Sequence, residues 1–202
     1  RVLFRSDIKN LPSGTYSVTI KDAMGCIKTL DARITQPPLL VQTLDAVTDI
    51  LCYGDKTGEV NITVRGGVPP YTYGWNNGGT TQDVKEIPAG KYSVTIKDAN
   101  GCTKTISVNI IQPPKIVHKL DTVINNRCYG ESNGAVNITV TGGVPPYSYK
   151  WNNGATTQDI SGVPAGKYTV QISESNGCTK TLSAEITQPK ILVVKIDSVK
   201  NI

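Results

Sequence analysis

Short runs of alternating apolar and polar residues follow one another along most of this chain. In one run, Val136, Ile138 and Val140 are separated by single polar residues, so the apolar side chains of an extended segment all fall on one face. The same alternation recurs in Tyr147, Tyr149 and Trp151, in Tyr168, Val170 and Ile172, and in Leu182, Ala184 and Ile186. No window has the spacing of an amphipathic helix. The pattern predicts half-buried β-strands and an all-β fold.

Turn-forming residues separate these runs. Residues 142–146, 152–154, 163–166 and 176–177 are rich in Gly, Asn and Pro. Gly and Asn tolerate the positive φ of tight turns, and Pro fixes the direction in which the chain enters them. Short strands joined by turns at this spacing are typical of a β-sandwich.

The whole pattern repeats along the chain. Cys52 recurs as Cys128 and Trp75 as Trp151, which sets a period of 76 residues. When residues 44–119 are laid over residues 120–195, 46 of the 76 positions are identical without a gap. A match of this extent indicates that two copies of one structural unit follow each other.

We therefore divide the chain into four parts. Residues 38–113 and 114–189 are complete repeats, residues 1–37 match only the C-terminal half of a repeat, and residues 190–202 match only its beginning. Residues 1–6 fit the repeat poorly, and we interpret them as the translation of a sequencing-adapter tail. We expect the chain to come from a longer array. A unit of this size is small for an independent core, so each repeat should depend on a neighbour or a cross-link.

Two aromatic positions narrow the sandwich to the immunoglobulin-like type. Trp75 and Trp151 occur where a third strand would place its aromatic side chain in the core. Tyr92 and Tyr168 follow a Pro-Ala-Gly corner at the start of the penultimate strand, where a tyrosine corner belongs. We interpret all four as core residues of tandem immunoglobulin-like β-sandwich repeats.

Composition removes several classes of partner. The net charge is +5, and the lysines are scattered without forming a run, which argues against nucleic acid as a partner. No segment approaches the roughly 18 apolar residues of a membrane span, so we expect no membrane insertion. The one histidine, His118, is not repeated, and no Cys or His pairs have the close spacing of a zinc site. We expect no metal and no cofactor.

Five cysteines occupy fixed positions in the repeat: Cys26, Cys52, Cys102, Cys128 and Cys178. In a chain rich in Gly, Pro, Thr and Asn, such cysteines favour structural disulfides in an oxidising compartment. Three ways of pairing them are compatible with the sequence.

Pairing within a copy would join Cys52 to Cys102 and Cys128 to Cys178, and each loop would contribute about 4 kcal/mol of stability. In an immunoglobulin topology, however, these positions lie at opposite ends of the sandwich. If copies stack end to end, Cys52 would instead join Cys178 of the next copy, and Cys26 and Cys102 would pair with cysteines outside this sequence. A third alternative joins Cys26 to Cys52 and Cys102 to Cys128. The sequence leaves the choice open.

Several motifs of the second complete copy occur together: Cys128-Tyr129-Gly130, Gly142-Gly143-Val144-Pro145-Pro146-Tyr147, Val163-Pro164-Ala165-Gly166-Lys167-Tyr168 and Asn176-Gly177-Cys178. With their counterparts in the other copies, they resemble the SprB repeat, a module of large cell-surface adhesins of gliding bacteria. The resemblance implies secretion by the type nine route, display on the outer cell surface, and a role in adhesion or gliding motility. One departure is Glu174, where the other copies have Asp98 and Asp22. Any ion site that depends on this carboxylate is therefore in doubt.

Candidate modification sites also follow from the resemblance. Asp121-Thr122-Val123 and Asp197-Ser198-Val199 look like the O-glycosylation motif of such bacteria, which makes Thr122 and Ser198 candidate glycosylation sites. Asn61 and Asn137 match an N-glycosylation sequon, but they lie inside predicted strands. We interpret them as ordinary outward-facing strand residues.

Nothing in the sequence resembles catalytic machinery. With one unrepeated histidine, no pair of nucleophile and base can be assembled within a copy. Asp83 and Asp159 each follow a Thr-Thr-Gln turn, and we expect them to stabilise that turn. We expect no enzyme.

Three functional hypotheses remain. In the first, the repeats form a structural stalk or filament segment of a surface adhesin, made semi-rigid by the Gln-Pro segments that close each unit. In the second, each repeat is a binding module that presents residues 143–147 and 151–154 to surface glycans. In the third, identical chains assemble into an extracellular fibre.

Overall fold

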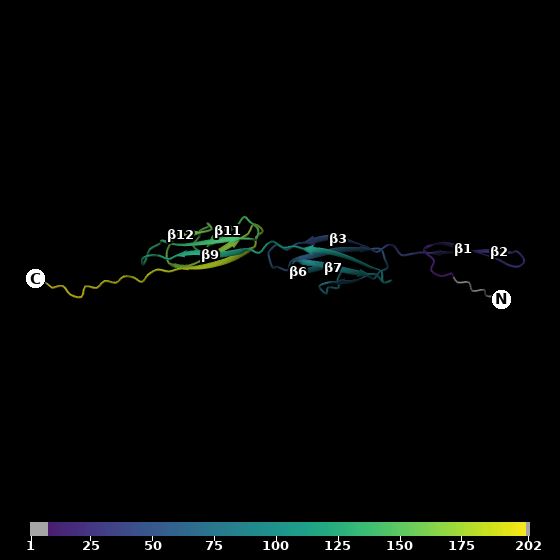
Figure 1. The fold of residues 1–202 in the computed structure, drawn as a ribbon, viewed down its shortest axis with the longest axis horizontal. Coiled ribbons are helices and arrows are strands. Elements are labelled where there is room, and N and C mark those ends of the chain that lie inside the picture. Colours follow the sequence, from purple (N-terminus) through teal and green to yellow (C-terminus); the bar gives the residue numbers. More distant parts are fainter. Residues whose placement is uncertain (1–7, 201–202) are drawn as a thin grey trace. The chain divides into compact units, whose positions relative to one another are not determined.

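The computed structural model describes residues 8–200, and within this range every regular element is a β-strand (Figure 1). Residues 1–6, which we interpret as an adapter-derived tail, lie outside the described residues. The described strands are β1 (Gly14–Lys21), β2 (Ile27–Ile34), β3 (Val41–Thr48), β4 (Gly58–Arg65), β5 (Thr72–Trp75), β6 (Val84–Ile87), β7 (Gly90–Lys97), β8 (Thr103–Ile110), β9 (Val117–Ile124), β10 (Gly134–Thr141), β11 (Ser148–Trp151), β12 (Ile160–Val163), β13 (Gly166–Ser173) and β14 (Thr179–Ile186).

The second complete repeat folds into two antiparallel sheets, with strand orders β12-β10-β9 and β11-β13-β14. Its first, second and fourth strands thus form one sheet, and its third, fifth and sixth form the other. Side chains from both sheets meet in a single core: Val136, Ile138, Ile160 and Val163 from one sheet, and Trp151, Tyr168, Val170, Ile172, Ala184 and Ile186 from the other. The prediction of an immunoglobulin-like sandwich is confirmed.

The first complete repeat has the same connectivity, with strand orders β3-β4-β6 and β5-β7-β8. Its buried residues occupy the positions equivalent to those of the second repeat. Val60 and Ile62 of β4 correspond to Val136 and Ile138, and all four are 1% exposed or less. Alternation therefore identifies the inward face of these strands correctly in both repeats.

The partial repeat is an isolated antiparallel pair, β1 and β2, which correspond to the last two strands of a complete repeat. Its apolar side chains are exposed: Val18 is 46% and Ile20 61% accessible. The equivalent Val94 and Ile96 of the first complete repeat are fully buried. The same strand sequence is thus buried only where a second sheet faces it.

By their backbone contacts, the described residues form two compact units. One contains the chain up to Asp45 together with Asn61–Gln82 and Ser93–Ser107. The other contains Ala46–Val60, Asp83–Tyr92 and the chain from Val108 onward. The division runs through the first complete repeat. The part of that repeat that carries Cys52 consequently belongs to the same unit as the whole of the second repeat.

The four aromatic landmarks lie in the core positions predicted for them. Trp75 and Trp151 are 5% and 2% exposed, and Tyr92 and Tyr168 are 6% exposed. Each indole N–H donates to a backbone carbonyl 2.9 Å away, that of Thr81 or Thr157. The hydroxyls of Tyr92 and Tyr168 donate at 2.9 Å to the carbonyls of Pro88 and Pro164, four residues upstream, as in a tyrosine corner.

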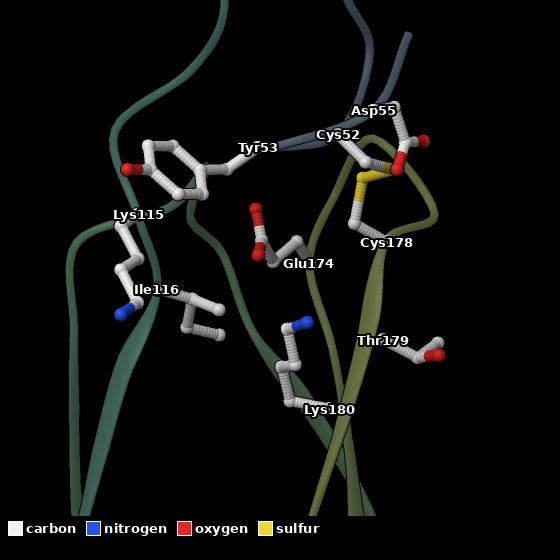
Figure 2. A pocket seen from close by; sticks show the side chains of 9 residues that line it. All are labelled: Cys52, Tyr53, Asp55, Lys115, Ile116, Glu174, Cys178, Thr179 and Lys180. Atoms are coloured by element: carbon white, nitrogen blue, oxygen red, sulfur yellow. A yellow bond between two sulfur atoms is a disulfide. The ribbon is translucent and has the colours of Figure 1, made fainter.

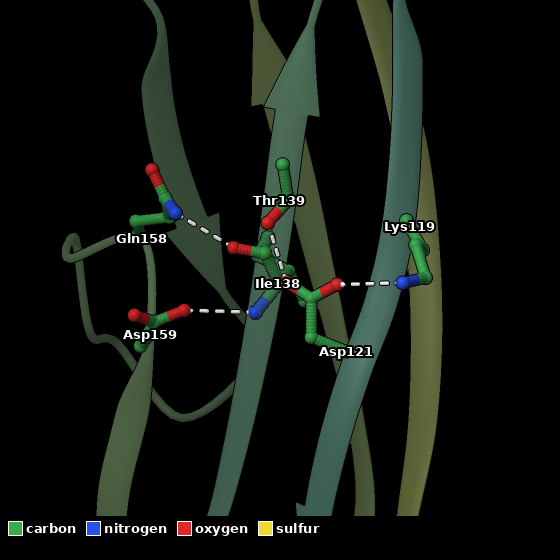
Figure 3. Close-up of polar contacts among 6 residues, drawn as sticks. All are labelled: Lys119, Asp121, Ile138, Thr139, Gln158 and Asp159. Atoms are coloured by element: carbon green, nitrogen blue, oxygen red, sulfur yellow. Dashed lines mark hydrogen bonds and ion pairs between the residues drawn. The ribbon is translucent and has the colours of Figure 1, made fainter.

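Two polar side chains bind the backbone of β10 at the point where its pairing with β9 is irregular (Figure 3). The register of β10 against β9 shifts between Asn137 and Ile138. The carboxylate of Asp159 accepts a hydrogen bond from the backbone N–H of Ile138 at 2.8 Å, and the amide of Gln158 donates to the carbonyl of Ile138 at 2.6 Å. The prediction that Asp159 stabilises its own turn is wrong. Its side chain binds the neighbouring strand, because the buried N–H of Ile138 needs an acceptor.

The segment that enters each repeat passes close to a Gly-Gly turn. In the first repeat the N–H of Gly67 donates to the carbonyl of Pro38 at 2.8 Å. A Cβ added to Gly66 would lie 1.9 Å from the carbonyl oxygen of Leu39, and one added to Gly142 would lie 2.2 Å from that of Lys115. Both glycines also have positive φ. No larger residue fits there without moving the entering segment.

We predict that Gly142→Ala destabilises the chain more than Gly154→Ala. Both glycines have positive φ, so an alanine costs about 1 to 2 kcal/mol at either position. Nothing lies within 4 Å of a Cβ at Gly154, whereas the Cβ at Gly142 meets the Lys115 carbonyl, which adds about 1 to 3 kcal/mol. Chemical denaturation of both variants measures the difference. Equal losses would show that the entering segment moves freely away.

Candidate functional site

A disulfide joins the two complete repeats. It links Cys52, in the loop after β3, to Cys178, directly before β14. The Cα atoms are 5.7 Å apart although 126 residues separate the two cysteines in the sequence. This Cα separation lies within the range that a protein disulfide spans. Both cysteines lie in the same compact unit.

A tight turn presents Cys178. The N–H of Glu174 donates to the carbonyl of Cys178 at 2.8 Å, and the N–H of Gly177 donates back to the carbonyl of Glu174 at 3.0 Å. The side-chain oxygen of Asn176 accepts the N–H of Cys178 at 3.3 Å. Gly177 has a φ of 88°, a conformation that glycine adopts without steric cost. The turn therefore holds the cysteine at the tip of the β13–β14 hairpin.

The segment that leaves the first repeat holds the Cys52 loop in place. The side-chain oxygen of Gln112 accepts the N–H of Gly54 at 2.9 Å. The backbone N–H of Ile50 donates to the carbonyl of Ile111, also at 2.9 Å. In the second repeat, Gln188 accepts the N–H of Gly130 at 2.8 Å. In each complete repeat, the Gln of the Gln-Pro motif thus fixes the Cys-Tyr-Gly loop of the same repeat.

Polar and aromatic groups surround the disulfide. The amide of Asn176 donates to the carbonyl of Leu51 at 2.7 Å, a hydrogen bond between the two repeats. Figure 2 shows the pocket beside the disulfide, where Tyr53 and Lys180 lie around the carboxylate of Glu174. Glu174 is 7% exposed, and its carboxylate accepts the N–H of Val144 at 2.9 Å. The junction is thus formed by one loop of the first repeat and one turn of the second.

Comparison with known families identifies the repeat. The SprB repeat family matches residues 44–80 and 120–156, which include the Cys-Tyr-Gly loop, the Gly-Gly turn and the tryptophan of each copy. The two matches are one sequence period apart. The chain contains SprB repeats.

The chain also has more distant likenesses. It is 22% identical over 197 residues to the protein dduB of Dictyostelium discoideum, and this match covers 89% of the chain and 16% of the length of dduB. Among solved structures, it is similar to three N-terminal domains of the outer capsid protein Hoc of bacteriophage RB49, with 20% identity and a TM-score of 0.38. This match covers 72% of the chain and 59% of the three-domain structure. It is also similar to the eight N-terminal immunoglobulin domains of Down Syndrome Cell Adhesion Molecule, with 12% identity, a TM-score of 0.48, and coverage of 88% and 28%.

The disulfide joins the two cysteines that could meet if successive repeats stack end to end. The structure has neither the pairing of cysteines within one repeat nor the pairing of cysteines adjacent in sequence. Cys26, Cys102 and Cys128 are exposed free thiols. In the sandwich, the Cys-Tyr-Gly loop and the last hairpin turn of one repeat are therefore not bonded to each other. The turn is bonded to the loop of the preceding repeat.

The turn that carries the cysteine differs between the SprB repeats. In the first complete repeat, the carboxylate of Asp98 accepts the N–H groups of Val68 at 3.0 Å, Asn100 at 3.0 Å and Cys102 at 2.8 Å. Burial raises the pKa of Asp98. The hydrogen bonds from these N–H groups and from that of Gly101 lower it by more, so the pKa of Asp98 is below its usual value. In the second repeat the longer Glu174 reaches only Val144, and Asn176 takes over the N–H of Cys178.

The candidate glycosylation sites are exposed. Thr122 lies on β9, and Ser198 lies outside any strand. The neighbouring Asp121 already has partners: it accepts a hydrogen bond from the hydroxyl of Thr139 and pairs with Lys119 at 3.4 Å (Figure 3). The hydrogen bond from the Thr139 hydroxyl lowers the pKa of Asp121. Burial opposes this effect and the charge of Lys119 adds to it, so the pKa is below its usual value. This aspartate therefore has a cross-strand role whether or not Thr122 is modified.

No metal or membrane element is found in the part of the chain that the structure describes. No group of three or more His, Cys, Asp and Glu side chains could hold a metal ion there. None of the described residues forms a helix that could cross a membrane. Asn61 and Asn137 lie on β4 and β10 and are half-buried.

Sequence reasoning missed the two polar contacts that position the junction. One is the hydrogen bond from Gly54 to Gln112, and the other is that from Asn176 to Leu51. The recurrence of Gln before Pro in each copy was a signal for the first contact. The second had no signal, because it depends on how one repeat meets the next.

We predict that Asp98→Asn lowers stability at neutral pH and that this loss shrinks in acid. The pKa of Asp98 is lowered in the folded state from 3.8, so its stabilising contribution is present above about pH 4 and is lost as the pH falls. Melting temperatures of the two proteins, measured from pH 7 down to pH 2, should converge. Parallel curves at all pH values would contradict the prediction.

Proposed function

We propose that this chain is a stalk segment of a large extracellular bacterial surface adhesin, used in adhesion or gliding, whose SprB repeats are cross-linked one to the next. The observation that carries the proposal is the disulfide between Cys52 of one repeat and Cys178 of the following one. A covalent bond between successive modules is of use to a protein that transmits force along its length. No catalytic group enters the proposal.

The positions of the two cysteines support a mechanical role. Cys52 follows β3 by a short loop, and Cys178 directly precedes β14. Tension applied at the two ends of the chain reaches Cys52 through β3 and leaves from Cys178 through β14. Strands β4 to β13 lie inside the covalent loop, so the disulfide carries the load past them.

The disulfide also supports stability and an extracellular location. In the chain-entropy model, closing a loop of 126 residues contributes about 5 kcal/mol. Each repeat has a core of modest size, so a contribution of this magnitude matters to it. Such bonds persist in oxidising surroundings outside the cytosol, which is where a surface adhesin operates.

The alternative of a glycan-binding module in each repeat is less well supported. Trp151 lies in one of the two loops that this alternative assigns to glycan binding, but its side chain is buried, as is that of Trp75. Their N–H groups donate to carbonyls of their own repeats. A spacer role needs no exposed aromatic residue and agrees with this arrangement. Surface glycans remain a partner to be tested.

We predict that the disulfide prevents most of the chain from extending under force. In a single-molecule pulling experiment between the two ends, adding a reductant should release the 126 residues of the loop, which is about 430 Å of additional contour length at roughly 3.4 Å per residue. Cys52→Ser should show the longer contour length with and without reductant. Equal lengths of the wild type in both conditions would contradict the proposal.

A glycan array on the same protein separates the two functions. A stalk segment should bind no glycan, while retaining the reductant-dependent contour length. Specific binding that is lost on removing residues 143–147 would instead favour the binding-module hypothesis.

A further inference from the structure

The first complete repeat has a second copy of the surface that holds the disulfide. Cys102 occupies the position that Cys178 has in the next repeat, and it is an exposed free thiol. The pocket beside it is lined by the equivalents of residues at the disulfide junction: Leu39, Leu40, Asp98, Thr103 and Lys104 correspond to Lys115, Ile116, Glu174, Thr179 and Lys180. We call this surface the Cys102 pocket.

The second complete repeat has a second copy of the loop that supplies the other half of the disulfide. Residues 127–131, called here the Cys128 loop, correspond to residues 51–55. The N–H of Gly130 donates to Gln188 at 2.8 Å, as that of Gly54 donates to Gln112 at 2.9 Å. Cys128 is an exposed free thiol, and Tyr129 is 55% exposed. The loop is thus held in the same way as the bonded loop.

We propose that the Cys128 loop of one copy of this chain docks in the Cys102 pocket of a second copy, and that the two cysteines then form a disulfide. The template for this contact is the Cys52–Cys178 junction, whose two halves occupy the same sequence positions. The loop is held by the same Gln hydrogen bond in both repeats. The turn is closed by the same pair of backbone hydrogen bonds, here from Asp98 to Cys102 and from Gly101 to Asp98. The inference rests on the proposed function, because it takes that junction as the way in which SprB repeats are joined. Its new element is the partner, a second copy of this chain.

The polar groups of the Cys102 pocket fit the incoming loop. At the existing junction, Asn176 donates to the carbonyl of Leu51 at 2.7 Å. The equivalent donor is the exposed side chain of Asn100, in the turn that carries Cys102, and the equivalent acceptor in the loop is the carbonyl of Arg127. At the existing junction, the side-chain oxygen of Asn176 also accepts the N–H of Cys178. In the first repeat the carboxylate of Asp98 accepts the equivalent N–H of Cys102, so that N–H does not depend on Asn100.

Cys26 provides an internal control. Its turn has the same geometry, because Asp22 accepts the N–H of Cys26 at 2.8 Å and that of Met24 at 2.9 Å. Met24, however, stands where the other turns have Asn100 and Asn176, and it has no amide to donate. No entering segment equivalent to residues 38–40 lies beside this turn in the described chain. Exposure alone therefore does not make Cys26 a docking site.

The chemistry needs an oxidant, which we take to be a small-molecule disulfide such as oxidised glutathione. One protein thiolate attacks a glutathione sulfur and releases one glutathione thiolate, leaving a mixed disulfide. The thiolate of the partner copy then attacks the protein sulfur and releases the second glutathione. Two protein thiols lose two protons and two electrons, and one glutathione disulfide becomes two glutathione thiols.

The two surfaces differ, and each copy has one of each. The contact is therefore head-to-tail. Such a contact leaves one free loop and one free pocket at the ends, so it extends into a series unless the rotation between copies closes a ring. Copies of the chain should join into linear series. The same contact would join consecutive arrays end to end.

The test uses the full chain with Cys26→Ser, in oxidised glutathione, read by non-reducing gels and by mass spectrometry of disulfide-linked peptides. We expect a ladder of oligomers with a Cys102–Cys128 linkage. Cys102→Ser and Cys128→Ser should each remain monomeric alone, and a mixture of the two should give a dimer and nothing longer. Asn100→Met should reduce the dimer yield about twofold to tenfold, through loss of one hydrogen bond.

Each outcome decides the proposal. Dimers of either cysteine variant by itself would reveal symmetric or random cross-linking, and would overturn it, as would the absence of any ladder. In the unmodified chain, disulfides that involve Cys26 should be rarer than the Cys102–Cys128 disulfide. If they are equally frequent, the proposal is overturned. The peptide map also reports Cys52–Cys178. If that linkage is present without the other, the docking inference fails alone; if it is absent, the proposed function fails.

Discussion

Two cysteines that are 126 residues apart in the sequence have Cα atoms 5.7 Å apart, and several features of the two SprB repeats depend on this one bond. A disulfide tolerates only a narrow range of separations, so both partners must be held independently. Gln112 holds the Cys52 loop, and the Glu174 turn holds Cys178. Gly142 allows the entering segment to pass close by. The junction is thus a property of backbone hydrogen bonds as much as of sulfur chemistry.

The two complete repeats stabilise the turn that carries their cysteine, Cys102 or Cys178, with different side chains. With Asp98, one carboxylate binds the N–H groups of the turn itself. With Glu174, the carboxylate is one methylene longer and binds the neighbouring loop, and Asn176 binds both its own turn and the preceding repeat. The exchange leaves an acceptor for the N–H of the cysteine and for that of Val68 or Val144 in each repeat, which explains how a departure from the repeat pattern leaves the fold unchanged.

The sequence predicted the parts of the structure that depend on neighbours within a repeat. Alternation placed Val136 and Ile138 in the core, and the Pro-Ala-Gly corner placed Tyr168. It could not choose among the cysteine pairings, because that choice depends on how successive repeats meet. Alternation also does not report whether a face is covered. Val18 and Val94 lie in the same sequence, Tyr-Ser-Val-Thr-Ile-Lys-Asp-Ala, yet one is 46% exposed and the other fully buried.

The loop closed by Cys52 and Cys178 is longer than the repeat, 126 residues against 76. A protease that cuts one peptide bond anywhere between these cysteines leaves the two fragments joined through sulfur. In an array with the same bond at every junction, successive loops would overlap, and the peptide bonds in the overlaps would be bridged twice. Such an array would survive scattered cleavage by secreted proteases without losing its covalent continuity.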